Sequence, residues 1–188
     1  MGAGEDDEAA RRCALFRRCQ AAEEACRRGD LDALRLALGD PPGFPNCVLD
    51  AEFLGLADRP LDLAIRLGPL ELIERMLALG AAPRAPAEDG FPPLFQAIDA
   101  PRPDRHAVLA LLLAHGADPE QHGLNDGTAL HHAVARRDLA ALRLLLAHGA
   151  DPAARTRIDD CSTPIEDAER AGFAEAAALM RAAARGSG

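Results

Sequence analysis

The chain has 188 residues, 48% of them apolar, which is enough for one folded domain with a hydrophobic core. Its 30 acidic and 21 basic residues give a formal net charge of −9, so the basic stripe typical of nucleic-acid binders is not expected. It has no Trp or Tyr, the commonest interface anchors, and its five cysteines form no CxxC pair. The cysteine pattern therefore indicates neither a disulfide framework nor a zinc site.

The N-terminal residues predict two helices and no targeting segment. MGAGEDDEAA lacks the apolar core of a signal peptide, and no stretch of the chain has the length and apolarity of a membrane span, so a cytoplasmic protein is expected. Helices are expected at Phe16–Arg28 and Leu31–Leu38. Cys19 and Cys26 lie seven residues apart on one face of the first helix, which favours burial as small apolar side chains.

Four helix pairs are expected after this segment. Their first helices begin near RPLDLA, PPLFQA, TALHHA and STPIEDA, and their second helices are apolar at helical spacing. The corresponding ranges are 59–83, 92–119, 128–152 and 162–180. Three of the second helices are followed by a glycine, namely Gly80, Gly116 and Gly149, and a glycine just beyond a helix enters the left-handed region without steric cost.

One phrase, LLLAHGADP, occurs at 111–119 and again at 144–152, which is 33 residues later. A fixed period of this length predicts stacked repeats, none of which can bury its apolar face alone. The clearest copy runs from Asn125 to Pro152, with a turn at NDG, a short helix at Thr128–Arg136 and a second helix carrying four leucines.

TALHHA followed by LLLAHGADP resembles the ankyrin repeat, whose first helix carries T-P-L-H-x-A and whose turn carries G-A-D. The resemblance extends over roughly residues 14 to 183 and implies an all-α ankyrin-repeat solenoid of stacked helical hairpins with short projecting loops. It implies a single domain over 1–188, divided into an N-terminal capping repeat at 14–40, three repeats at 41–83, 84–119 and 120–152, a C-terminal capping repeat at 153–183 and a tail at 184–188. All basic residues are Arg, which together with abundant Ala and Gly indicates a GC-rich, bacterial genome.

In the ankyrin family, the signature Thr and His join hydrogen bonds that fix the start of the first helix. Thr128 and His131 keep both residues, and Thr163 keeps one, with Glu166 in place of the His. The other two units keep neither and are expected to depend more on packing and to be less regular. Their residues in these positions are Arg59 and Asp62 in the second unit and Pro92 and Phe95 in the third.

Two loops are longer than the resemblance requires. Residues 41–58 are about eight residues too long, and DAPRPDR at 99–105 adds about three. Each loop either carries binding specificity or has drifted in a tolerant surface position. The first contains apolar side chains that must pack or bind something, namely Phe44, Val48, Leu49, Phe53 and Leu54.

The histidines raise the question of a metal or acid–base site. His115 and His148 are equivalent in successive repeats. Packed helices lie about 8–10 Å apart, whereas each zinc–ligand bond is about 2 Å long. These two histidines are therefore not expected to share a metal ion, and no cofactor is expected. His132, at the variable position of its repeat, has acid–base potential together with His122 and Asp126. No nucleophile or catalytic motif accompanies them, so an enzyme is not expected.

The resemblance implies a protein–protein interaction module that binds a partner protein through its concave groove. The acidic balance suggests a partner with basic patches, with neither nucleic acid nor membrane expected, and the oligomeric state is left open. Two alternatives remain, an immunity or antitoxin-type inhibitor of a basic toxin and an enzyme that uses His132 with nearby acids. The residues placed on the groove by the family frame are Asp89, Phe91, Gln96, Asp99, Asn125, Asp126, His132, Arg136, Arg157 and Asp159.

Overall fold

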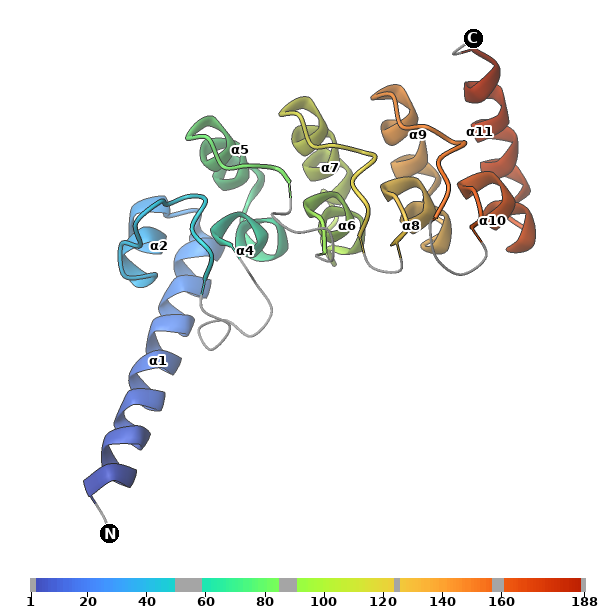
Figure 1. Cartoon of the computed structure of the whole chain (residues 1–188). Coiled ribbons are helices and arrows are strands. Elements are labelled where there is room, and N and C mark those ends of the chain that lie inside the picture. Colours follow the sequence, from blue (N-terminus) through green and yellow to red (C-terminus); the bar gives the residue numbers. More distant parts are fainter. Residues whose placement is uncertain (1–2, 50–58, 85–90, 124–125, 157–160, 187–188) are drawn as a thin grey trace. The chain divides into compact units, whose positions relative to one another are not determined.

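The structure is a computed structural model that describes residues 3–49, 59–84, 91–123, 126–156 and 161–186 (Figure 1). Within these ranges the chain forms ten helices and no strand, which confirms the all-α prediction. The chain divides into two compact units, Met1–Ala82 (unit 1) and Pro83–Gly188 (unit 2).

Unit 1 contains α1 (Ala3–Arg28), α2 (Leu31–Ala37), α4 (Pro60–Leu67) and α5 (Leu70–Ala78). Helix α1 packs on α2 and α4, and α4 packs on α5. Asp30 caps the N-terminus of α2 by accepting a hydrogen bond from the Ala33 N–H at 3.0 Å. The side chains that form the core of unit 1 include Ala22, Cys26, Leu34, Leu61, Leu63, Ile65, Leu72, Ile73 and Met76.

Helix α1 begins much earlier than predicted, at Ala3 rather than Phe16. Its side chains from Arg11 to Ala14 are exposed, and Phe16 is 62% exposed, so this part has no apolar face from which periodicity could predict a helix. Burial begins further along the helix. Cys26 is fully buried, as expected, whereas Cys19 is only partly buried.

The start of α4 is fixed by a buried ion pair. Arg59 donates from Nε and Nη2 to the two carboxylate oxygens of Asp62, at 3.2 and 3.1 Å, and from Nη1 to the Ala82 carbonyl at 3.1 Å. Both residues are 5% exposed. As expected, this unit lacks the Thr–His network, but a charged pair occupies the same positions and adds polar bonds to the packing.

The long loop after α2 is fastened to the end of α5. The Asn46 side chain donates to the Gly80 carbonyl at 2.8 Å and accepts from the Ala82 N–H at 2.7 Å. Of the loop's apolar side chains, Leu49 is buried and Val48 is 70% exposed. Phe53 and Leu54 lie outside the described residues.

Unit 2 stacks three helical hairpins in two layers (Figure 1). One layer contains the first helices of the hairpins, α6 (Pro93–Asp99), α8 (Ala129–Ala135) and α10 (Pro164–Arg170), and the other contains the second helices, α7 (Arg105–Ala114), α9 (Leu139–Ala147) and α11 (Ala174–Gly186). Fully buried side chains between them include Leu109, Leu112, Leu130, Leu142, Leu145 and Met180. Gly116 and Gly149 both have φ of +84°, which confirms their predicted role as helix-ending residues.

The signature residues behave as the resemblance implies. The Thr128 N–H donates to His131 Nδ1 at 3.1 Å, and His131 Nε2 lies 3.1 Å from the Ser162 carbonyl of the next hairpin. This leaves Nδ1 as the acceptor and Nε2–H as the donor. In α10 the Thr163 N–H donates to Glu166 Oε2 at 2.8 Å, so Glu166 takes the place of the histidine.

Candidate functional site

Three rings gather on the first-helix layer of unit 2. The Phe95 ring of α6 stacks on the imidazole of His132 from α8, with centroids 4.5 Å apart and an interplanar angle of 16°. Phe91, just before α6, meets Phe95 edge-on at 5.9 Å and His132 edge-on at 5.8 Å. Phe95 is 1% exposed and Phe91 is 38% exposed, so the group has a buried base and a partly exposed edge.

The same helices are joined by charged side chains. The Asp99 carboxylate of α6 accepts from Arg136 Nε and Nη2, each at 2.6 Å, and from His132 Nε2 at 2.9 Å. A bidentate guanidinium–carboxylate pair fixes the plane of both groups. The Arg136 side chain is nevertheless 56% exposed. We call Phe91, Phe95, Asp99, His132 and Arg136 the aromatic–charge cluster.

Burial and hydrogen bonding determine the protonation states in this cluster. Burial raises the pKa of Asp99, but the hydrogen bonds from Arg136 and His132 outweigh it and hold that pKa below its usual value. Burial lowers the pKa of His132 and outweighs the opposing effect of Asp99. Near neutral pH the cluster therefore contains a carboxylate, a guanidinium and a neutral imidazole that donates from Nε2.

This arrangement predicts a loss of stability in mild acid. Burial is also the main cause that lowers the pKa of His131, so the folded chain takes up these two protons at lower pH than the unfolded chain, whose histidines titrate near 6.5. Stability is then fully present above about pH 7 and falls as the pH drops below about 6.5. Thermal unfolding between about pH 8 and pH 5 measures this slope.

A matched pair of variants tests how much of this change of stability with pH comes from His132. His132→Gln keeps a donor toward Asp99 and should reduce the slope, whereas His148→Gln, at an exposed position, should leave it unchanged. An identical slope in wild type and His132→Gln would contradict the assignment.

The structure brings together part of the predicted groove set. Phe91, Asp99, His132 and Arg136 belong to the cluster, and Gln96 supports it by donating from Nε2 to the Phe91 carbonyl at 2.9 Å. Asp126 does not join it. The remaining four predicted residues, Asp89, Asn125, Arg157 and Asp159, lie outside the described residues.

The combination of His132, His122 and Asp126 predicted for acid–base chemistry is not assembled as one group. His132 is hydrogen-bonded to Asp99, whereas His122 Nδ1 lies 3.2 Å from an Asp126 carboxylate oxygen and 2.7 Å from its carbonyl. Across the described ranges, no group of three or more His, Cys, Asp or Glu is placed to hold a metal ion.

Sequence reasoning missed a second charged cluster next to the first. Asp138 caps α9 by accepting from the Ala141 N–H at 3.0 Å, and it also accepts from Arg105 Nη2 at 2.9 Å and contacts His106 Nε2 at 2.8 Å. Between the two clusters lies a polar cavity of about 350 Å³, which includes neither His132 nor His122 in its lining. The residues that line it are Ile98, Asp99, Ala100, Pro101, Arg105, Arg136 and Asp138.

Both clusters carry a signal that was present in the sequence. Asp99 and His132 are 33 residues apart, and so are Arg105 and Asp138. Arg105 and Asp138 occupy equivalent positions in the second helices of adjacent hairpins, whereas Asp99 lies one turn further along its first helix than the equivalent of His132. A search for an acidic residue 33 positions from an arginine or histidine finds both contacts.

Comparison with known proteins agrees with this geometry. A family model described as ankyrin repeats (3 copies) matches residues 61–156, slightly more than half of the chain. No curated protein matches the chain. In the part of the chain that the structure describes, no helix combines the length and apolarity needed to cross a bilayer. Ankyrin repeats generally mediate protein–protein interaction through the surface that their stacked units present. The stacked hairpins, the Thr128–His131 network and the family match show that the chain belongs to the ankyrin-repeat family.

Proposed function

We propose that the chain binds a partner protein through the first-helix layer of unit 2, with the aromatic–charge cluster at the centre of the contact. The observation that carries the proposal is that Phe91 and Arg136 reach the surface while the buried Phe95 and the half-buried Asp99 hold them in place. Aromatic and arginine side chains dominate the energetics of protein interfaces. Side chains that are already ordered lose less entropy on binding.

The remaining predicted contacts extend this surface. Gln96 lies on α6 within it. Its border is proposed to contain the remaining predicted residues, namely Asp89, Asn125, Asp126, Arg157 and Asp159. The formal net charge of −9 favours a partner with basic patches. The five-repeat division, the cytoplasmic location and the bacterial source remain predictions from sequence.

The proposal is tested by capture of partners from a lysate of the producing cell, quantified by mass spectrometry. Phe91→Ala combined with Arg136→Gln removes both exposed side chains and is expected to reduce recovery of the bound partner about tenfold or more, since interface hot spots contribute about 2 kcal/mol or more. Arg143→Gln is the matched control, because Arg143 is an exposed arginine on the second helix α9. Equal recovery with all three proteins would refute the groove assignment.

The identity of the captured protein shows whether this interaction module acts as a toxin inhibitor. A basic nuclease among the proteins lost from the double variant would favour the inhibitor. An enzyme built on His132 is disfavoured because its imidazole is stacked on Phe95 and hydrogen-bonded to Asp99.

A further inference from the structure

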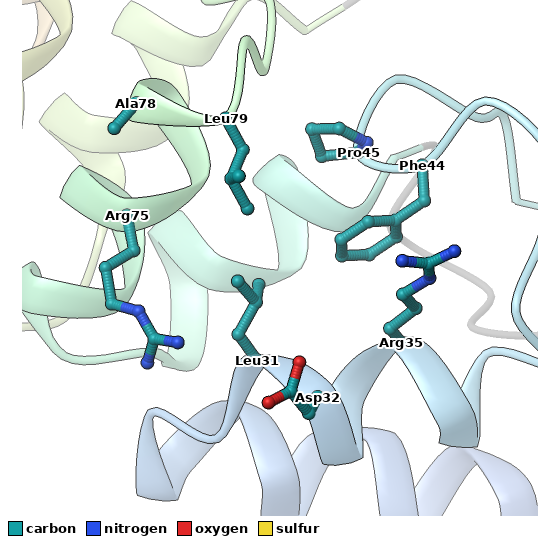
Figure 2. A pocket seen from close by; sticks show the side chains of 8 residues that line it. All are labelled: Leu31, Asp32, Arg35, Phe44, Pro45, Arg75, Ala78 and Leu79. Carbon is teal, nitrogen blue, oxygen red and sulfur yellow. The ribbon is translucent and has the colours of Figure 1, made fainter.

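A second candidate site lies in unit 1, on its second helices. A cavity of about 570 Å³ is formed by α2, the loop that follows it and the end of α5 (Figure 2). We propose that it binds a segment of a partner protein that carries a bulky apolar side chain followed by a carboxylate. This inference goes beyond the proposed function, because its residues belong to another unit and to second helices.

The cavity is built by the extra loop. Figure 2 shows Phe44 of this loop, Leu31 of α2 and Leu79 after α5 pointing toward a common space. The bonds from Asn46 to Gly80 and Ala82 hold the loop against the end of α5. The described part of the loop, residues 41–49, is therefore a fixed wall of the cavity, which argues against simple drift of this part of the segment.

The walls suit an apolar side chain. Leu79 is 58% exposed although it is large and apolar, and Leu31 is 7% exposed beneath it. Phe44 is half-buried and offers its ring to the same space. A volume of about 570 Å³ lies within the range of about 300–1,000 Å³ that is usual for ligand pockets.

The charges at the cavity favour a carboxylate as the second group of the ligand. Arg35, Arg75 and one acid, Asp32, line it, and a second acid, Asp40, pairs with Arg35 from beside it, so Arg75 is the guanidinium that a ligand carboxylate would meet. Arg75 makes one long hydrogen bond, from Nη1 to the Gly29 carbonyl at 3.4 Å, and has no carboxylate partner in the part of the chain that the structure describes.

The second arginine is held in place at the cavity. Arg35 Nε donates to Asp40 at 2.5 Å, and its guanidinium lies 5.9 Å from the centroid of the Phe44 ring. This orientation leaves its Nη groups for a ligand. Guanidinium groups bind carboxylates through paired hydrogen bonds, so an acidic segment fits the site better than a basic one.

The test uses the full ¹⁵N-labelled chain and three synthetic peptides. The first probe, acetyl-Gly-Phe-Glu-Glu-Gly-amide, should give saturable shifts at the amides of Leu31, Ala78 and Leu79 and at the Arg75 Nε–H, with a millimolar dissociation constant. A probe with Lys in place of both Glu should bind about tenfold more weakly, because it offers no carboxylate to Arg75 and places a like charge beside it. A probe with Ala in place of Phe should bind about fivefold more weakly or worse, because it leaves the apolar walls uncovered.

Variants at exposed positions test the two halves of the site. Arg75→Gln and Leu79→Ser should each weaken the first probe about fivefold, whereas Arg143→Gln should not change its affinity. Circular dichroism checks that each variant is folded. If a variant does not fold, the comparison of the three peptides on the wild-type chain still decides the question.

Three results would overturn the proposal. They are equal affinity for the Glu and Lys peptides, shifts that fail to saturate or that lie away from the cavity, and concentration-dependent shifts at the same residues without peptide, which would indicate contact between two copies of the chain. None of them bears on the groove of unit 2, whose test depends on Phe91 and Arg136. Failure of the two proposals is therefore distinguishable.

Discussion

Asp62→Ala is expected to destabilise unit 1 by about 3–5 kcal/mol, because it leaves the Arg59 guanidinium buried without its counter-charge. The Asp62 and Arg59 side chains are 5% and 6% exposed, and two hydrogen bonds join them. Arg59 also holds the Ala82 carbonyl, so its displacement would leave the chain segment after α5 held by the Asn46 bonds. Urea unfolding followed by circular dichroism measures the loss, and amide hydrogen exchange assigns it to unit 1.

Two comparison variants separate burial from charge pairing. Glu23→Ala breaks the Arg27–Glu23 pair on α1, whose side chains are 50% and 39% exposed, and should cost about 1 kcal/mol or less. Replacing Arg59 with Met and Asp62 with Leu together removes both charges and should recover most of the stability lost in Asp62→Ala. Equal losses in Asp62→Ala and Glu23→Ala would contradict the interpretation of the buried pair.

The helix pairs and their ends were predictable because local chemistry marks them. Gly80, Gly116 and Gly149 all adopt positive φ after a second helix, where the sequence places them. The N-terminal part of α1 was not predictable in the same way. Its side chains from Arg11 to Ala14 are exposed, and hydrophobic periodicity reports only the helices that bury a face.

The Arg59–Asp62 pair shows why comparison with a motif can mislead. The absence of Thr and His suggested a loss of polar bonding, yet a different pair of residues fixes the same helix start. The relevant question for each unit is which side chains hold the first turn, and residue types other than the signature do so here, the Arg59–Asp62 ion pair of α4 being the first example. Glu166 in α10 is the second example.

Four of the predicted groove residues meet in the aromatic–charge cluster, but their contacts were not predictable. The sequence placed Phe91, Asp99, His132 and Arg136 on one surface, but it did not show that His132 bonds to Asp99. The argument that equivalent side chains lie about 8–10 Å apart excludes a shared metal ion. It does not exclude contact between long side chains of opposite charge, which reach across one repeat.

The cavity in unit 1 was beyond prediction for another reason. The sequence identified the extra loop and its apolar residues, but the position of a loop depends on individual hydrogen bonds rather than on periodicity. Here the Asn46 amide makes two such bonds to residues more than 30 positions away. The loop's direction follows from them.

Phe95→Ala is the second change with a large expected effect, about 3–5 kcal/mol of lost stability in unit 2, because Phe95 is 1% exposed and its removal leaves a cavity. Gly123 confirms how closely this ring is packed, since a Cβ there would lie 2.8 Å from the Phe95 ring. The loss of the ring also removes the stacking partner of His132 and the edge contact of Phe91. Partner binding should therefore fall together with stability.

Two further variants distinguish the structural and binding roles of these rings. Phe95→Leu keeps apolar volume and loses the stacking, which is worth about 0.5–1.5 kcal/mol, and it should raise the pKa of His132 toward its ordinary value because the imidazole becomes more hydrated. Phe91→Ala, at a position 38% exposed, should cost about 1 kcal/mol or less in stability but still weaken partner capture. Urea unfolding, an NMR titration of His132 and the capture assay measure the three effects. A Phe95→Leu chain with an unchanged His132 pKa would show that the stacked ring does not shield the imidazole from water.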